Sequence, residues 1–205
     1  MNQYIKMLVE DIHSVIVATV DEKGHPVTRA IDLMLEDGNT FYFLTAKGKA
    51  FYKQLIERPY IACTGMTGGE GTMNKKAISI RGEVTCIGKE KLDEIFAKNP
   101  YMAEIYPEKA SRGALVVFKM VKGEGEFFDL STKPMTRASF TIGMNVSHQD
   151  PYTINENCVG CAKCVAVCPQ KCISTDQVPF VINASHCLHC GNCYEVCDHH
   201  AVTRR

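Results

Sequence analysis

The chain carries CVGCAKCVAVCP at residues 158–169 and CLHCGNCYEVCD at residues 187–198. Both runs have the spacing C-x2-C-x2-C-x3-C, and they begin 29 residues apart, so the region is an internal repeat. Pro169 follows the last cysteine of the first run, whereas Asp198 follows that of the second. Cysteines at fixed, repeated spacing indicate ligands that share a metal, and not a hydrophobic core alone.

The spacing is that of proteins that hold two 4Fe–4S clusters. Three thiolates at two-residue gaps wrap one face of a cluster, and a fourth ligand must come from elsewhere in the chain. The cysteine three residues further on is expected on a short helix that points away, so it ligates the other cluster. The predicted ligand sets are Cys158, Cys161, Cys164 and Cys197 for one cluster, and Cys187, Cys190, Cys193 and Cys168 for the other.

Two other uses of clustered cysteines fit less well. Structural zinc sites use paired C-x2-C knuckles separated by a longer loop, which this dense pattern does not follow. Disulfide frameworks form in oxidising compartments, and the N-terminus has no basic stretch leading into an apolar export signal. Cys172 is expected to pack beside a cluster. The nearby histidines are expected to be solvated or to lie behind the ligands: His186, His189, His199 and His200.

Charge and composition narrow the function classes. The 205 residues include 23 basic and 23 acidic side chains, and a net charge of zero argues against a nucleic-acid-binding protein. No apolar run reaches the roughly 18 residues of a transmembrane helix, so we expect a cytoplasmic protein that does not bind membranes. Of the 11 cysteines, all but Cys63 and Cys86 follow Ser147. This shift predicts two domains, residues 1–145 and 146–205.

The first domain alternates between strand and helix patterns. Apolar and β-branched stretches bounded by turns predict strands at residues 14–20, 26–35, 40–45, 60–67, 76–87, 114–121, 126–130 and 140–142. Helices are predicted at residues 3–12, 49–58 and 89–98. No strand–GxGxxG–helix unit occurs, which argues against a dinucleotide-binding Rossmann domain. The order predicts an α+β chain, mainly an antiparallel barrel with peripheral helices, followed by a small cysteine-rich α+β domain.

A set of short motifs gives the first domain a family resemblance. They are Ala18-Thr19-Val20-Asp21, Gly24-His25-Pro26, Arg29, Phe41-Tyr42-Phe43-Leu44-Thr45, Ala46-Lys47-Gly48-Lys49, the segment 53–59 and Arg81-Gly82-Glu83. In this order they resemble the FMN-binding split-barrel family related to pyridoxamine 5′-phosphate oxidase, over most of residues 1–145. Residues from about 150 to 205 resemble a bacterial two-4Fe–4S ferredoxin domain. The resemblances imply two 4Fe–4S clusters and FMN as cofactors.

The split-barrel resemblance implies an FMN site at the interface of a homodimer. A basic residue on the second strand and one before the first large helix hold the flavin phosphate in this family, and a helix N-terminus favours an anion. The implied cofactor-binding residues are Arg29, Thr45, Lys47, Gly48, Lys49 and Arg81. Many members place an Arg-Lys pair where this chain has Phe51, so the choice among Lys47, Lys49 and Lys53 stays open. The late residues Phe127, Phe128 and Arg137 are candidates to reach a partner's flavin.

A flavin and two clusters on one chain predict a redox protein. Clusters carry single electrons and a flavin accepts one or two, so a one-electron donor such as a ferredoxin can feed a two-electron reaction, or the reverse. The prediction is an FMN-dependent oxidoreductase of anaerobes that acts on a small molecule and exchanges electrons with a redox partner protein. The resemblance makes a nitro-group or quinone-like acceptor compatible. The alternative is a non-enzymatic electron carrier or redox sensor, with FMN or with haem or a deazaflavin in its place, so enzymatic activity stays open.

Overall fold

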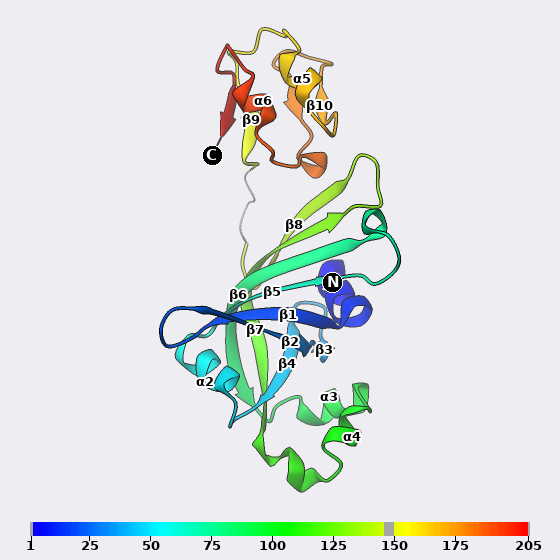
Figure 1. The fold of residues 1–205 in the computed structure, drawn as a ribbon, viewed down its shortest axis with the longest axis vertical. Coiled ribbons are helices and arrows are strands. Elements are labelled where there is room, and N and C mark those ends of the chain that lie inside the picture. The colour runs from blue at the N-terminus through cyan, green and yellow to red at the C-terminus, as the bar shows by residue number, and fades with distance from the viewer. Residues whose placement is uncertain (1, 146–149, 205) are drawn as a thin grey trace. The chain divides into compact units, whose positions relative to one another are not determined.

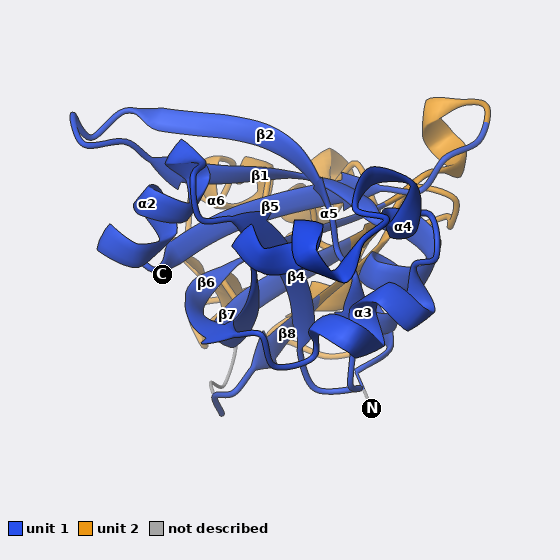
Figure 2. Ribbon diagram, turned by 90° about the horizontal axis from the view of Figure 1, so that it is seen from below, with its two compact units in different colours: residues 1–69, 77–127, 139–145 blue, residues 70–76, 128–138, 146–205 orange. Residues whose placement is uncertain are grey.

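The computed structural model describes residues 2–145 and 150–204, which divide into two compact units (Figures 1 and 2). The first unit contains residues 1–69, 77–127 and 139–145. The second gathers residues 70–76 and 128–138 with the cysteine-rich region from residue 146 onward. The boundary expected between residues 145 and 146 adjoins residues 146–149, which lie outside the described residues.

An antiparallel sheet is the framework of the first unit. Seven of its eight strands follow the order β2-β1-β5-β6-β7-β4-β3, and the eighth, β8, pairs with β7. The strands are β1 (Ser14–Val20), β2 (Pro26–Asp32), β3 (Leu35–Glu36), β4 (Phe41–Ala46), β5 (Tyr60–Met66), β6 (Lys76–Gly88), β7 (Leu115–Asp129) and β8 (Thr136–Ile142). Burial alternates along β1, β5 and β6, which is the pattern of a sheet with one face in the core. The α+β, mainly antiparallel fold is confirmed.

Helices cover parts of this sheet. Helix α1 (Gln3–Lys6) continues as a π-helix over Met7–Ile12, and α2 (Ala50–Glu57) buries Phe51 and Leu55. Helix α3 (Leu92–Lys98) buries Leu92, Ile95 and Phe96, and α4 (Met102–Ile105) follows it. Short 3-10 turns lie at Thr72–Asn74 and Lys109–Ala114. The three predicted helices are confirmed, while α4 was not predicted.

Strand β7 corrects the sequence prediction of two strands at residues 114–121 and 126–130. It runs without a break over Leu115–Asp129, through Gly123 and Gly125. A Cβ at Gly125 would collide with the ring of Phe140, and one at Gly123 would lie 2.8 Å from the sulfur of Met120. These glycines therefore serve close packing inside a continuous strand, and the turn that they suggest in the sequence does not form.

The second unit is built from short repeated elements. Strand β9 (Tyr152–Ile154) pairs with β12 (Val202–Arg204), and β10 (Ile173–Ser174) pairs with β11 (Val181–Ile182). Helix α5 (Lys163–Val167) and helix α6 (Asn192–Glu195) carry equivalent places of the two cysteine runs, and a 3-10 turn spans Ala184–His186. This is the small ferredoxin-like region expected from the sequence.

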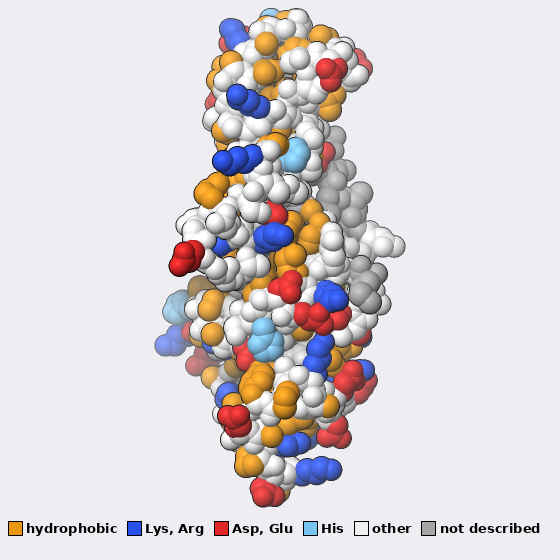
Figure 3. Space-filling model, turned by 90° about the vertical axis from the view of Figure 1, so that its right-hand side faces the viewer, with side chains coloured by type: hydrophobic (Ala, Val, Ile, Leu, Met, Phe, Trp, Pro, Cys, Tyr) orange, Lys and Arg blue, Asp and Glu red, His pale blue; other side chains and the backbone are white. Residues whose placement is uncertain are grey.

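The charge distribution and the length of the helices relate to the predictions about nucleic-acid and membrane binding. Acidic and basic side chains are interspersed on the face shown in Figure 3, in keeping with the zero net charge. No helix among the described residues is long and apolar enough to cross a membrane.

A glycine in β6 tests the close packing of the long strands. A Cβ at Gly82 would collide with the backbone oxygen of Lys122, so we expect Gly82→Ala to lower the free energy of unfolding by about 1–3 kcal/mol. Gly113→Ala is the control, because a Cβ there meets no atom within 4 Å, and its effect should stay within about 0.5 kcal/mol. Urea unfolding followed by circular dichroism measures both. Equal stability of the two variants would contradict this account of the packing.

Candidate functional site

The second unit contains two cavities, each lined by four cysteines of the predicted sets. The first is lined by Cys158, Cys161, Cys164 and Cys197. The second is lined by Cys168, Cys187, Cys190 and Cys193, and also by Cys172. In each case three cysteines come from one run and the fourth from the other. The two runs thus interlock around two separate spaces.

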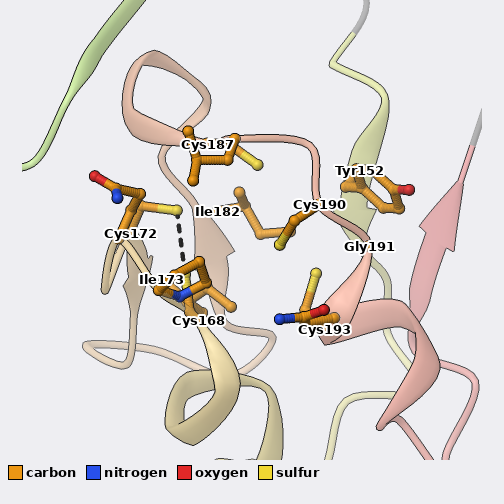
Figure 4. A pocket seen from close by; sticks show the side chains of 13 residues that line it. Tyr152, Cys168, Cys172, Ile173, Ile182, Cys187, Cys190, Gly191 and Cys193 are labelled. Atoms are coloured by element: carbon orange, nitrogen blue, oxygen red, sulfur yellow. Dashed lines mark hydrogen bonds between the residues drawn. The ribbon is translucent and has the colours of Figure 1, made fainter. Parts of the chain in front are cut away.

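Figure 4 shows the second cavity from close by. The sulfur atoms of Cys187, Cys190 and Cys193 surround it. Cys172 lies on the same wall as Cys168, and their sulfur atoms are 3.5 Å apart. Among the described residues, no three His, Cys, Asp or Glu side chains converge on a point that one metal ion would occupy. The sulfurs of each set stand around a space instead.

The backbone places two positive φ angles in each cysteine loop, which turn the chain around the cavity. In the first loop they occur at Gly160 (75°) and Ala162 (60°). In the second they occur at His189 (56°) and Gly191 (84°). Each loop ends in a short helix that begins directly before the third cysteine, so the repeat in sequence is also a repeat in backbone conformation.

The fourth cysteine of each run lies where backbone N–H groups favour the thiolate. For Cys197, burial opposes the charge, but the N–H groups of Val202 and Ala201 outweigh burial and lower its pKa. The N–H of Ala201 lies 3.3 Å from the Cys197 sulfur. The pKa of Cys168 is lowered in the same way, by backbone N–H groups that outweigh burial. Metal ligation needs the thiolate, so these two positions suit it.

Burial dominates at two other cysteines of the second cavity. It raises the pKa of Cys193 to about 11 and that of Cys172 to about 12. For Cys172, the neighbouring sulfur of Cys168 adds to the rise. Because the pKa of Cys193, a predicted ligand, is raised as well, the shift does not separate the two residues, and the packing role of Cys172 stays a prediction.

In the first unit, helix α2 covers a polar group that includes Arg29. The guanidinium donates from Nη1 to the hydroxyl of Thr19 (2.7 Å) and from Nη2 to Oε1 of Gln54 (3.0 Å). It also lies over the ring of Phe51, with 4.3 Å between the guanidinium carbon and the ring centroid. Burial lowers the pKa of Arg29. A guanidinium has five N–H donors, so these contacts leave donors over for an anion.

Thr45 lies under the same helix and holds an unused polar atom. Phe43, two residues earlier on β4, stacks on Phe51 with ring centroids 6.0 Å apart. Side chains two residues apart on a strand share a face, so Thr45 points toward α2 as well. Its hydroxyl is buried and has no hydrogen-bond partner among the described residues. An orphaned buried hydroxyl is uncommon in a folded protein and suits a ligand that supplies the missing partner.

In the loop 47–49 before α2, lysine side chains are available to bind an anion, whereas two of the backbone N–H groups are already hydrogen-bonded. The N–H of Lys47 donates to the Ala114 carbonyl (2.9 Å), and the N–H of Lys49 donates to the Ala46 carbonyl (3.1 Å). Both lysine side chains are exposed, and a Cβ at Gly48 would meet no atom within 4 Å. An anion at this helix start would therefore meet the two ammonium groups and the free N–H groups of the first helical turn.

Arg81 lies apart from the other predicted residues. The register pairs Arg29 with Val17, Val17 with Cys63 and Cys63 with Ile80, so these side chains share the core face. Arg81 follows Ile80 and takes the opposite face, where it forms an ion pair with Glu124 at 3.5 Å. Within one chain, the structure brings Arg29, Thr45 and the loop 47–49 to α2, and it does not bring Arg81 to them.

Sequence reasoning missed a polar cluster at the end of β2. The hydroxyl of Tyr101 donates to Asp32 (2.8 Å), Ser14 donates to the same carboxylate, and Nε2 of His13 lies 3.0 Å from the tyrosine oxygen. Burial and the carboxylate raise the pKa of Tyr101 above its usual range. The local backbone of these residues has one unusual feature, the positive φ of His13 (61°). The sequence does not reveal that angle, so no local signal pointed to the cluster.

Comparisons with known proteins match both halves. Residues 1–127 match the family described as pyridoxamine 5′-phosphate oxidase, and residues 150–198 match the 4Fe-4S dicluster domain. The pyridoxine/pyridoxamine 5′-phosphate oxidase of Bacteroides thetaiotaomicron is 31% identical over 106 residues, 51% of this chain and 47% of that protein. The chain thus spans about half the length of this curated relative. A protein named ferredoxin 7Fe from Hydrogenibacillus schlegelii is 40% identical over 53 residues, 25% of this chain and 68% of that protein.

Solved structures with the same fold are more distant in sequence. A NimC/NimA family protein from Clostridium acetobutylicum has a TM-score of 0.55 at 20% identity, covering 68% of this chain and 94% of that chain. A heme binding protein from Mycobacterium smegmatis has a TM-score of 0.51 at 11% identity, covering 67% and 56%. At such identities the likeness shows the fold, and the two predicted family resemblances are confirmed by the sequence matches.

Proposed function

The chain belongs to the pyridoxamine 5′-phosphate oxidase family and carries a 4Fe–4S dicluster domain, and from this premise we propose that it is an FMN-dependent oxidoreductase fed or drained through its own clusters. Its substrate is a small molecule, and a redox partner protein exchanges single electrons with the clusters. We assign residues 1–145 to the flavin domain and residues 146–205 to the ferredoxin domain.

The observation that carries the proposal is the pair of cavities, each lined by four cysteines from both runs. Four thiolates around each space are the donor set of a 4Fe–4S cluster. We assign Cys158, Cys161, Cys164 and Cys197 to the first cluster, and Cys187, Cys190, Cys193 and Cys168 to the second. Bound clusters and flavin would supply one-electron transfer and its conversion to two-electron chemistry.

The polar residues at α2 support a phosphate-bearing flavin. Arg29 has guanidinium donors left over, Thr45 has an unpartnered hydroxyl, and Lys47 and Lys49 flank the open space at Gly48. A cationic loop before a helix start is suited to binding an anion. We propose that these residues hold the FMN phosphate, and that the chain's role there is binding and orientation.

The outer face of the sheet supports a homodimer. Ile16, Tyr60 and Met66 point to that face and are 49%, 52% and 53% exposed. They share the face with Arg81, because the register pairs Arg81 with Ala62, two residues along β5 from Tyr60. A second copy that covers these apolar side chains would also bury Arg81 in the interface, where the resemblance implies the flavin. The proposed FMN site would then draw residues from both copies.

An anaerobic absorption spectrum and a turnover assay test the function. We expect flavin bands together with a broad iron–sulfur shoulder, and sustained substrate-dependent reoxidation of the reduced protein by nitro or quinone acceptors. A Soret band, or no flavin after reconstitution with FMN, would contradict the flavin proposal. A single stoichiometric oxidation without turnover would favour an electron carrier over an enzyme.

Iron content tests the exchange of ligands between the runs. We expect Cys197→Ala to remove one of two clusters, because Cys197 lines the cavity of Cys158, Cys161 and Cys164. Iron should fall from about eight per chain toward half of that value. Cys172→Ala is the matched control and should keep about eight, since four other cysteines line its cavity. Full iron in the Cys197 variant would rule out the assignment.

Flavin affinity tests the phosphate site. We expect Lys49→Ala to weaken FMN binding about tenfold, or about 1.4 kcal/mol, because it removes a charged partner of the phosphate. Lys53→Ala is the control, since the Lys53 ammonium already pairs with Glu22 (3.6 Å) and Glu57 (3.7 Å). Fluorescence titration of the apoprotein with FMN gives both dissociation constants. Unchanged affinity in the Lys49 variant, with a loss in Lys47→Ala, would transfer the role to Lys47.

A further inference from the structure

Three polar side chains under helix α2 form a closed cycle of hydrogen bonds. Nη1 of Arg29 lies 2.7 Å from Oγ1 of Thr19, and that oxygen lies 2.7 Å from Oε1 of Gln54. The same Oε1 lies 3.0 Å from Nη2 of Arg29, which closes the cycle. The three residues come from β1, β2 and α2. The guanidinium is therefore held by two partners that also hold each other.

The donors and acceptors of this cycle are fixed by the chemistry of its members. A guanidinium can only donate, so the oxygen atoms that face it on Thr19 and Gln54 both accept. The Thr19 hydroxyl then directs its own hydrogen to Gln54, whose amide turns its oxygen toward the cycle. Thr19 is 3% exposed, and a buried hydroxyl needs such a partner within the protein.

Helix α2 contacts the guanidinium at its face and at its edge. Gln54 follows Phe51 by three residues, which places both side chains on one side of the helix. The Phe51 ring covers the face of the guanidinium, with 4.3 Å between the guanidinium carbon and the ring centroid. Gln54 accepts a hydrogen bond at the edge. A planar cation held in both ways has little freedom to turn.

The cycle leaves Arg29 able to bind a ligand. It uses two of the five N–H donors of the guanidinium. The unpartnered hydroxyl of Thr45 lies under the same helix, and Lys47 and Lys49 precede that helix. An arginine that is fixed before its ligand arrives loses less side-chain entropy on binding than a free one. The arrangement therefore suits an oxyanion that enters a preformed site.

We propose that Gln54 and Thr19 are positioning residues, which hold the guanidinium of Arg29 in the orientation that receives the phosphate of FMN. The inference rests on the FMN site of the proposed function, which does not include either residue. Their effect passes through Arg29, so it depends on a phosphate in the ligand and on the presence of that arginine. A residue that only anchors α2 would affect every flavin alike.

Affinities for FMN and for riboflavin, which lacks the phosphate, test this role in the full chain freed of flavin. Gln54→Met keeps the length of the side chain and removes the acceptor. We expect it to weaken FMN binding about fivefold and to change riboflavin binding by less than about twofold. Fluorescence titration gives both dissociation constants. Tyr52→Phe is the control, because it removes a polar atom of α2 outside the cycle and should leave both affinities unchanged.

The threonine provides a second pair of variants. Thr19→Val removes the hydroxyl at nearly constant volume and should give the same selective loss of FMN affinity. Thr19→Ser keeps the hydroxyl and should retain most of that affinity. Urea unfolding followed by circular dichroism identifies the variants that fold. The Thr19 pair decides the question if Gln54→Met does not fold.

A double-mutant cycle separates positioning from direct contact with the flavin. In an Arg29→Ala chain, adding Gln54→Met should change FMN affinity by less than about twofold, because the residue through which Gln54 acts is gone. A full fivefold loss in that background, unchanged FMN affinity in Gln54→Met, or equal weakening of FMN and riboflavin would overturn the inference. A wild-type chain that binds no FMN, or binds riboflavin as tightly, would instead overturn the proposed phosphate site.

Discussion

The second unit depends on an exchange of cysteines between its two halves. Cys197 of the second run lines the first cavity, and Cys168 of the first run lines the second. Neither cavity is complete until both halves have folded against each other. The apolar core of this unit is small and includes Cys164 and Cys193 themselves. A domain this small is only marginally stable by itself, and here the free energy of cluster binding would add to the free energy of folding.

In the first unit, the packing of Phe51 has a comparable structural role. Its ring stacks with that of the sheet residue Phe43 and also contacts the guanidinium of Arg29, so the contacts that hold helix α2 also orient a cation. Burial lowers the pKa of Arg29, yet a guanidinium titrates so far above neutrality that the charge persists. Structural support and the proposed anion binding would therefore share one side chain. This sharing explains why a strand residue can be committed to the fold and still serve the proposed flavin phosphate.

Particular residues show how far sequence reasoning reached. The apolar and β-branched stretches at residues 14–20, 60–67 and 76–87 predicted strands correctly, because such side chains fit a pleated sheet surface. Gly123 and Gly125 misled it, since a glycine that avoids the ring of Phe140 looks the same in sequence as a glycine in a turn. The cluster of His13, Asp32 and Tyr101 was invisible for a related reason. Its members are brought together only by the end of β2 and the start of α4.

The sequence by itself predicted how the cysteines group and which families the two halves belong to, because ligand spacing and strand-forming composition are local and survive in one dimension. The tertiary structure alone decided that Arg29 and Arg81 take opposite faces of the sheet, and that Arg137 reaches His189. Both outcomes depend on strand register and on where a strand end meets a distant loop. Both are set by contacts between residues far apart in the sequence, which no local periodicity of the chain can predict.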